Sequence, residues 1–495
     1  MKAAVRFRRA KVVCTIGPAS RDEGTFRRLI EAGMDAVRIN FSHTSHGDAA
    51  RVVGLARDMA RQTGRPLAVL ADLQGPKIRI GELTAALAVV PGDLFVFVPE
   101  ADPEAGPASA GREEPRSMDG RPRGRVIPSS YAALAEDVAA GDRILVDDGR
   151  VAFQVRSVEG ARVTAEALTD GRLESHKGIN LPGTDVKVAA LTEKDREDLT
   201  LALDVGVDYV ALSFVRRARD VEELRELVGD RALIIAKIEK LQAVRNLVEI
   251  MRASDGVMVA RGDLGVELDF EEVPVVQKRI LRLSRESTSI GITATQMLES
   301  MVTAPRPTRA EVSDVANALL DGTDAVMLSA ETAVGEHPVE AVQAMCRVIQ
   351  RIERERGFIE DASDIGPPRL RARSYHSVAG AIAGAAAEAT ERLKAPFLVT
   401  FTRSGFTARL MAAQRPEAPI LAVTDEACTF HQLAMVWGTV PILHEGEVSY
   451  DAMLGRAKAF ALEAGLGEEG QPFVVTAGVP FHVPGTTNYM RIETL

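Results

Sequence analysis

The chain has few cysteines, few aromatic residues and no long apolar run. Its three cysteines, Cys14, Cys346 and Cys428, are far apart among 495 residues, which gives neither a disulfide framework nor a zinc motif. No apolar run approaches the roughly 18 residues of a membrane-spanning helix. The basic stretch from Arg6 to Lys11 also lacks the apolar segment of a signal peptide. We therefore expect a cytoplasmic protein that makes no contact with a membrane.

An excess of positive charge is absent as well. The sequence has 60 Lys and Arg against 70 Asp and Glu, a net charge of −10. General nucleic-acid binders carry a basic surface, so this balance argues against nucleic acid as a partner. The length exceeds what one hydrophobic core supports and suggests about three domains.

Eight short apolar segments, separated by amphipathic stretches, predict parallel β/α units. Eight strands close a (β/α)₈ barrel, or TIM barrel, and segments 1–77 and 184–355 together approach the roughly 250 residues typical of that fold. The expected strands are residues 11–16, 36–41, 67–72, 209–214, 233–238, 256–260, 290–295 and 325–329.

Two further regions differ from the barrel in pattern. Residues 78–183 interrupt the β/α units, and apolar residues alternate there from Ile144 to Val155, which predicts a small all-β domain placed as a lid. Inside this insertion, the Pro-, Gly- and charge-rich residues 101–125 predict a mobile loop without a core. From 356 to 495 a new series of β/α units predicts an open α/β domain.

Charged residues stand where two of the barrel strands end. Lys237 and Glu239 close the fifth strand, and Asp263 follows the sixth. The carboxyl ends of barrel strands carry the active site in this fold. Two carboxylates beside an ammonium can hold a divalent metal and stabilise a neighbouring anion. A structural ion-pair network that caps the strands is the alternative explanation.

Other strand ends carry similar groups. Arg38, Asn40 and Ser42 alternate at the end of the second strand and therefore share one face. A guanidinium there can bind a phosphate or carboxylate with two hydrogen bonds. The third strand ends in Asp72 and the seventh in Thr295. So many polar strand ends favour a catalytic mouth over unrelated polar residues.

Six blocks of the sequence resemble the pyruvate kinase family. The resemblance is collinear from about Lys11 onward and includes the inserted β domain and the terminal α/β domain. It implies phosphoryl transfer from phosphoenolpyruvate to ADP, giving pyruvate and ATP, by a homotetramer. The blocks are Asn40–His43, Asp72–Arg79, Ala236–Lys240, Met258–Glu267, Ala294–Met301 and Arg306–Asp324.

The resemblance assigns roles to the residues that bind the metal and the phosphoryl group. Glu239 and Asp263 are expected to hold Mg²⁺, for which Mn²⁺ can substitute. Lys237 is expected to neutralise charge on the phosphoryl group and the enolate, and Arg38 to bind the phosphate. Thr295 is expected to order the proton donor at the enolate carbon.

Further roles concern the carboxylate and the nucleotide. Gly262 is expected to let the backbone approach the substrate carboxylate, because it has no Cβ to obstruct the approach. Arg79 and Lys177 flank the insertion and are expected to meet the phosphates of ADP. Asn40 and His43 are expected to contribute, although a structural role for His43 remains open.

One departure from the family concerns the monovalent cation. Many members hold K⁺ with side chains that match Asn40, Ser42 and Asp72 and with a threonine that is Leu73 here. Those members carry a glutamate where this chain has Lys77. A lysine ammonium can replace the ion because both supply one compact positive charge. We therefore expect that K⁺ is not required.

The C-terminal domain contains a candidate effector loop. Hydroxyl groups, an arginine and backbone N–H groups at a helix N-terminus together form an anion site. In the family the matching loop receives a sugar phosphate or nucleotide, so we expect activation by a phosphorylated metabolite. Helix capping by Ser404 or Thr407 is the alternative. The loop residues are Thr402, Arg403, Ser404, Gly405 and Thr407.

Two other functions stay open from the residues. A metal-dependent aldolase or lyase acting on pyruvate or phosphoenolpyruvate also uses carboxylates on neighbouring barrel strands, but it does not explain the insertion with Arg79 and Lys177. A catalytically silent effector-binding protein is the second alternative. It is expected to have lost Lys237, Glu239, Asp263 or Thr295, and all four are present.

Overall fold

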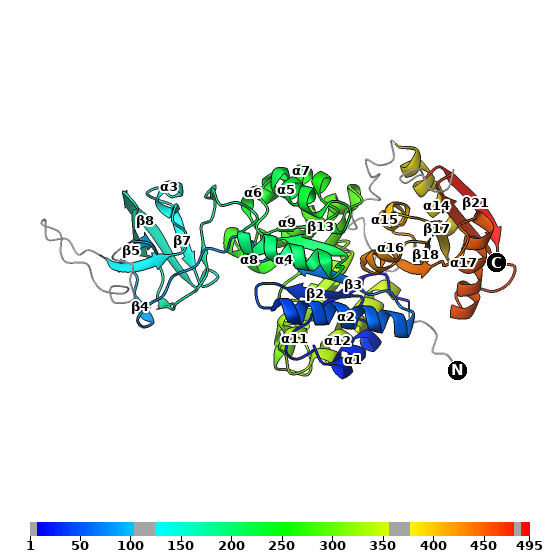
Figure 1. The fold of residues 1–495 in the computed structure, drawn as a ribbon, viewed down its shortest axis with the longest axis horizontal. Coiled ribbons are helices and arrows are strands. Elements are labelled where there is room, and N and C mark those ends of the chain that lie inside the picture. The colour runs from blue at the N-terminus through cyan, green and yellow to red at the C-terminus, as the bar shows by residue number, and fades with distance from the viewer. Residues whose placement is uncertain (1–6, 103–123, 356–376, 480–486) are drawn as a thin grey trace, which may run out of the picture.

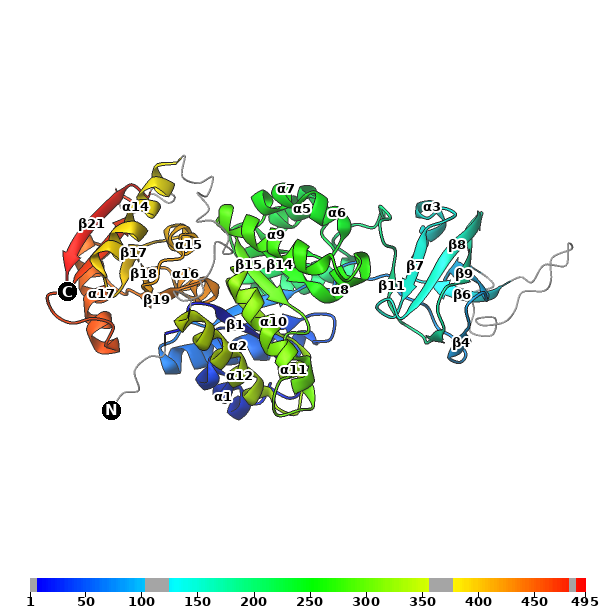
Figure 2. The ribbon, with the colours of Figure 1, turned by 180° about the vertical axis from the view of Figure 1, so that it is seen from behind.

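The computed structural model describes residues 7–102, 124–355, 377–479 and 487–495. Figure 1 shows three units in a row, with a barrel in the middle, a β unit at one end and an α/β unit at the other. Figure 2 shows the same arrangement from behind. The mobile loop expected at 101–125 falls mainly on residues 103–123, which lie outside the described residues.

The central unit is a closed parallel barrel in the order β1-β16-β15-β14-β13-β12-β3-β2. All eight expected strands are present, each within two residues of its predicted bounds, and the TIM barrel is confirmed. The strands are β1 (Lys11–Thr15), β2 (Ala36–Asn40), β3 (Ala68–Asp72), β12 (Tyr209–Leu212), β13 (Leu233–Ile238), β14 (Gly256–Ala260), β15 (Ile290–Ala294) and β16 (Ala325–Leu328).

Amphipathic helices follow the barrel strands. Side chains cap several of them; Asp22 and Ser45, for example, accept the backbone N–H of Thr25 and Asp48 at the starts of α1 and α2. No helix within the described ranges is both long and apolar enough to cross a membrane. The helices are α1 (Glu23–Ala32), α2 (His46–Thr63), α4 (Glu193–Asp204), α5 (Ala218–Val228), α6 (Leu241–Arg245), α7 (Leu247–Ala253), α8 (Arg261–Glu267), α9 (Val273–Glu286), α10 (Arg309–Leu320), α11 (Ala330–Ala333) and α12 (Pro338–Arg354), with a 3₁₀ turn at Glu299–Val302.

The inserted unit has its own sheet and its own core. Six strands lie in the order β11-β7-β8-β9-β5-β6, and β10 pairs with β4. The ring of Phe153 packs edge-to-face on Phe95 and Phe97, with centroids 5.3 and 5.4 Å away. Its elements are β4 (Leu87–Val89), β5 (Leu94–Pro99), β6 (Arg125–Ser129), α3 (Leu134–Asp137), β7 (Arg143–Val146), β8 (Val151–Glu159), β9 (Arg162–Ala167), β10 (Gly171–Leu173) and β11 (Ile179–Asn180).

The C-terminal unit is an open sheet in the order β19-β18-β17-β20-β21, parallel except for β21. The open α/β domain predicted for this part of the chain is confirmed. The elements are α14 (Val378–Leu393), β17 (Leu398–Phe401), α15 (Phe406–Ala413), β18 (Ile420–Thr424), α16 (Ala427–Gln432), a 3₁₀ turn (Leu433–Met435), β19 (Thr439–Leu443), α17 (Tyr450–Ala464), β20 (Pro472–Ala477) and β21 (Tyr489–Thr494).

The C-terminal unit contacts the barrel at the amino ends of its strands. Lys11 Nζ donates to the carbonyl of Thr439 at 2.7 Å, and burial lowers the pKa of Lys11 to about 8. Tyr209 donates to the last carbonyl of α16 at 2.7 Å. Arg415 pairs with Asp324, just before β16, also at 2.7 Å. The carboxyl ends of the strands are thereby left for the functional site.

Candidate active site at the carboxyl ends of the barrel strands

The ammonium of Lys237 lies at the centre of a buried ion cluster. Its Nζ is 2.9 Å from Glu239 Oε1 and 3.3 Å from Asp72 Oδ1, and it donates to Ser213 Oγ at 2.8 Å. Both carboxylate side chains are only 1 % exposed. The strands that carry or precede these residues, β3, β12 and β13, are neighbours in the barrel. The structure therefore brings together residues that are more than 160 positions apart in the sequence.

Opposite charges determine the protonation of this cluster. Burial acts to lower the pKa of Lys237, but Asp72 and Glu239 outweigh it, and the net change is upward. Burial acts to raise the pKa of Asp72, but Lys237 and Arg38 lower it below its ordinary value. For Glu239, burial and the nearby Asp263 carboxylate raise the pKa despite Lys237. Glu239 is thus the member that gains most from a further cation.

Arg38 and Lys237 both form ion pairs with Asp72. Its Nε donates to Asp72 Oδ2 at 2.7 Å, and its Nη1 donates to Thr15 Oγ1 at 3.0 Å. Asp72 therefore fixes two cations, one on each side, at the ends of neighbouring strands. Such an arrangement can stabilise an anion with negative charge spread over several oxygens.

Glu239 and Asp263 supply oxygens suited to a divalent cation. Glu239 Oε2 accepts the backbone N–H of Phe214 at 2.7 Å. Its Oε1 is buried and lies 2.9 Å from Lys237 Nζ. Asp263 lies in the first turn of α8, after the strand next to β13, and close enough to raise the pKa of Glu239. Hard divalent ions prefer such oxygen ligands.

Thr295 adopts a strained backbone conformation. Its φ is +72° and that of Gln296 is +55°, a left-handed region that costs non-glycine residues about 1–3 kcal/mol. Arg261 holds this turn in place. Its guanidinium donates to the carbonyls of Thr295 at 2.7 Å and Ala294 at 3.2 Å, and pairs with Asp314 at 2.6 Å. Arg261 is a positioning residue for Thr295.

Gly262 is required by the packing of the same turn. A Cβ at this position would lie 2.9 Å from Thr295 Cγ2, closer than such carbons approach. The glycine therefore lets Thr295 pack over the first turn of α8, beside Asp263. The sequence suggested a glycine for ligand approach, and the structure adds this internal reason.

The residues that match a monovalent-cation site offer only some of the oxygens that such a site needs. Asn40 Oδ1 accepts the backbone N–H of Ser42 at 3.1 Å, and Asp72 is engaged by two cations. Leu73 is buried and offers no side-chain oxygen. The Lys77 ammonium has no hydrogen bond or ion pair with any residue in the described ranges. A positive charge is thus already present at this edge of the mouth.

His43 and Arg79 lie in one cationic region. Burial lowers the pKa of His43, and the charges of Arg79, Arg38 and Lys77 lower it further, so the imidazole is neutral at pH 7. Arg79 Nη1 donates to the carbonyl of His176 at 2.9 Å, which links the two chain segments that enter and leave the β unit.

Lys177 pairs with two carboxylates of the β unit. Its Nζ lies 3.0 Å from Asp147 Oδ1 and 3.6 Å from Glu174 Oε2. The hydrogen bond to Asp147 raises the pKa of Lys177. Of the residues expected to meet the nucleotide, Lys177 is therefore the one with its charge already compensated.

The candidate effector loop follows β17 at a reversal in strand order. The chain proceeds from β17 to β18 and β19 on one side, and then returns to β20 on the other. Ligands of open α/β sheets bind at the carboxyl ends of strands at such a switch point. Across it, Thr407 Oγ1 lies 2.8 Å from Thr487 Oγ1.

Side-chain capping does not account for this loop. The N-cap of α15 is Gly405, with φ +74° and no side-chain hydrogen bond to the helix. Capping by Ser404 or Thr407 was therefore the wrong alternative. Arg403 is exposed and pairs with Glu426 at 2.6 Å, while Thr402 is buried.

Three residues of the site were missed in the sequence. Ser213 and Thr15 end the fourth and first strands, so the strand-end rule that found Asp72 could have found them too. Arg261 gave no such signal, because its role depends on Thr295 being near it in space.

Comparison with known proteins agrees with this geometry. The family model described as "Pyruvate kinase, barrel domain" matches residues 7–342, and "Pyruvate kinase, alpha/beta domain" matches residues 380–493. A pyruvate kinase of Mycobacterium intracellulare is 44% identical over 491 residues, covering 99% of this chain and 98% of that protein. One of Agrobacterium vitis is 43% identical over 486 residues, with 98% of each chain covered. The chain therefore belongs to the pyruvate kinase family and is an enzyme, a phosphotransferase.

Proposed function

We propose that the chain transfers the phosphoryl group of phosphoenolpyruvate to ADP, giving pyruvate and ATP. The observation that carries this proposal is the buried Lys237, held between Asp72 and Glu239, with Arg38 on the other side of Asp72. Phosphoryl transfer needs in-line positioning and fixed cations around the moving charge more than covalent help. Two cations fixed by one buried carboxylate fit that need.

Each residue at the mouth receives a role in this reaction. Arg38 binds the phosphate of phosphoenolpyruvate, and Lys237 neutralises the phosphoryl group in transit and the enolate that remains. The backbone at Gly262 meets the substrate carboxylate. Thr295, kept in its left-handed turn by Arg261, orders the proton donor for the enolate carbon.

The chain divides into three proposed domains. We propose that 1–77 and 184–355 form the catalytic barrel, that 78–183 form a lid, and that 356–495 form an effector and oligomerisation domain. The separate Phe153 core of the insertion supports its motion as a unit. The homotetramer remains a prediction.

A divalent ion fits the two carboxylates. Glu239 and Asp263 would hold Mg²⁺, with Mn²⁺ as a substitute, and the Asp263 carboxylate close to Glu239, which raises the pKa of Glu239, supports this assignment. When bound, the ion would supply positive charge to the substrate oxygens. No group of three or more His, Cys, Asp or Glu residues in the described ranges is arranged for a metal, so substrate and water would complete its coordination.

Glu239→Gln should raise the Mg²⁺ concentration for half-maximal activity by about tenfold or more, because it removes a charged ligand. The measurement is a lactate-dehydrogenase-coupled assay with phosphoenolpyruvate, ADP and varied Mg²⁺. Glu267→Gln is the matched control, since Glu267 is a buried carboxylate paired with Lys240. An unchanged Mg²⁺ dependence in the Glu239 variant would refute the assignment. Wild type with no activity at any Mg²⁺ would favour an aldolase, a lyase or a silent protein.

For the monovalent cation, we propose that Lys77 replaces K⁺. Its ammonium has no counter-ion among the described residues. Leu73 also has no side-chain oxygen at the position where the matching site has a threonine. Asn40, Ser42 and Asp72 then need not coordinate a monovalent ion.

The rate in K⁺-free buffer, with ionic strength kept constant by an inert salt, should equal the rate with K⁺. The reason is that the Lys77 charge is covalently present at all times. Steady-state kcat and KM for phosphoenolpyruvate are the quantities to compare. A drop of severalfold on omission of K⁺ contradicts the proposal.

ADP is proposed to bind between the barrel mouth and the lid. Arg79, Asn40 and His43 line the barrel side, and the neutral His43 can donate or accept a hydrogen bond without adding charge. Lys177 would have to exchange Asp147 for a phosphate, and both partners lie on the lid.

The loop after β17 is proposed to bind a phosphorylated activator. Its place at the switch point and the backbone N–H groups of α15, uncapped by side chains, support an anion there. Arg403 would exchange Glu426 for the phosphate, and Ser404 and Thr407 would add hydroxyl groups.

The double variant Arg403→Ala with Ser404→Ala should abolish activation by any phosphorylated metabolite that activates wild type, while the basal rate stays the same. The substitutions remove a charge and a hydroxyl but leave the barrel mouth intact. The response is read as the shift in half-saturating phosphoenolpyruvate. An undiminished response places the effector elsewhere.

A further inference from the structure

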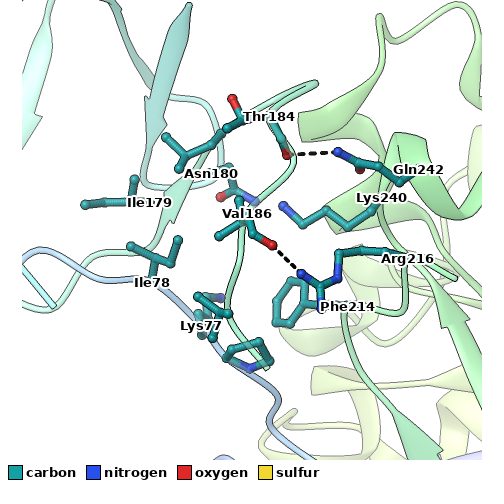
Figure 3. A pocket seen from close by; sticks show the side chains of 13 residues that line it. Lys77, Ile78, Ile179, Asn180, Thr184, Val186, Phe214, Arg216, Lys240 and Gln242 are labelled. Carbon is teal, nitrogen blue, oxygen red and sulfur yellow. Dashed lines mark hydrogen bonds between the residues drawn. The ribbon is translucent and has the colours of Figure 1, made fainter. Parts of the chain in front are cut away.

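A cavity lies at the hinge between the β unit and the barrel, beside the ion cluster. It opens to solvent. Figure 3 shows its walls, which come from both chain segments that connect the β unit and from the loops after β12 and β13. Residues central to the argument are Lys77, Ile78, Ile179, Asn180, Phe214 and Gln242.

The returning linker is tied to the barrel around this cavity. Gln242 Nε2 donates to the carbonyl of Thr184 at 2.8 Å, and Arg216 donates to the carbonyl of Val186. Both bonds are drawn in Figure 3. The linker is thus anchored to the barrel at two points, and these two bonds fix one wall of the cavity.

Two amide groups in the walls lack partners. Asn180 is only 7 % exposed, and its side chain makes no hydrogen bond to any residue of the described ranges. Gln242 Oε1 is buried and also has no hydrogen-bond partner there. The amide atoms of Asn180 are not fully buried, so a ligand in the cavity can reach them and supply the missing hydrogen bonds.

The cavity also carries one uncompensated positive charge. Lys240 is paired with Glu267 at 2.5 Å, and Arg216 with Asp220 at 3.4 Å. Lys77 has no counter-ion among the described residues. A ligand with a single negative charge would therefore neutralise the cavity.

We propose that the hinge cavity binds a small aromatic carboxylate with one further hydrogen-bonding group. Ile78, Ile179 and the Phe214 ring provide apolar surface for the ring of the ligand. Lys77 pairs with the carboxylate, and the Asn180 amide meets the second polar group. Because the ligand touches both linkers and the barrel, its binding restrains the β unit and gives a means of regulating lid motion.

The test is a binding titration with 6-hydroxy-2-naphthoate, followed by the fluorescence of the probe, on the full chain without substrates. Saturable binding to one site is expected. Asn180→Leu, which replaces the amide by an apolar group of similar size, should weaken it about tenfold. The uncharged analogue 6-hydroxy-2-naphthalenemethanol should also bind about tenfold more weakly, because it cannot pair with Lys77.

Two further variants make the result unambiguous. Val186→Phe fills the cavity, leaves Asn180 in place and should abolish binding; thermal midpoints establish that each variant is folded. Lys237→Met alters the substrate mouth and should bind the probe as wild type does. Three results would each overturn the proposal. They are the absence of saturable binding to wild type, binding as tight as wild type in the Asn180 or Val186 variant, and loss of binding in the Lys237 variant. Since binding is measured without turnover, these outcomes leave the proposed reaction untouched.

Discussion

The site depends on one buried interaction, the ammonium of Lys237 between the carboxylates of Asp72 and Glu239. Removing these charges from water is costly, and only close pairing offsets the cost. Asp72 is balanced by two cations, Lys237 and Arg38, whereas Glu239 has one cation, Lys237, and the Asp263 carboxylate nearby. The Glu239 side of the cluster therefore carries more negative charge than the Asp72 side.

The rest of the fold supports this cluster from separate directions. The C-terminal unit packs on the amino ends of the strands through Lys11 and Arg415, so stability and chemistry occupy opposite ends of the barrel. On the open side, Arg261 keeps Thr295 in a strained turn, which places a hydroxyl where a relaxed chain would not. The linker bonds of Gln242 and Arg216 fix the hinge beside the mouth.

Much of the fold and of the candidate site could be predicted, because both depend on the local apolar pattern and on which residues end the strands. Short apolar segments gave the eight strands, and charged residues at their ends gave Lys237, Glu239 and Asp72. The left-handed turn at Thr295 could not be predicted, because threonine has no preference for it and Arg261 holds it from the start of helix α8. Pairs such as Lys177 with Asp147 depend on how the sheet of the insertion folds. The six-residue helix α16 is too short for its periodicity to be recognised.

The central claim is that the charge of Lys237 stabilises the transferring phosphoryl group. The most direct measurement compares kcat for phosphoryl transfer in Lys237→Met and in Lys11→Met, which removes a buried ammonium at the opposite end of the barrel. The account predicts a loss of about 10³-fold or more for the Lys237 variant and nearly wild-type kcat for the Lys11 variant, with both proteins folded. A Lys237 variant that keeps kcat within about tenfold of wild type, or equal losses in both variants, would contradict it.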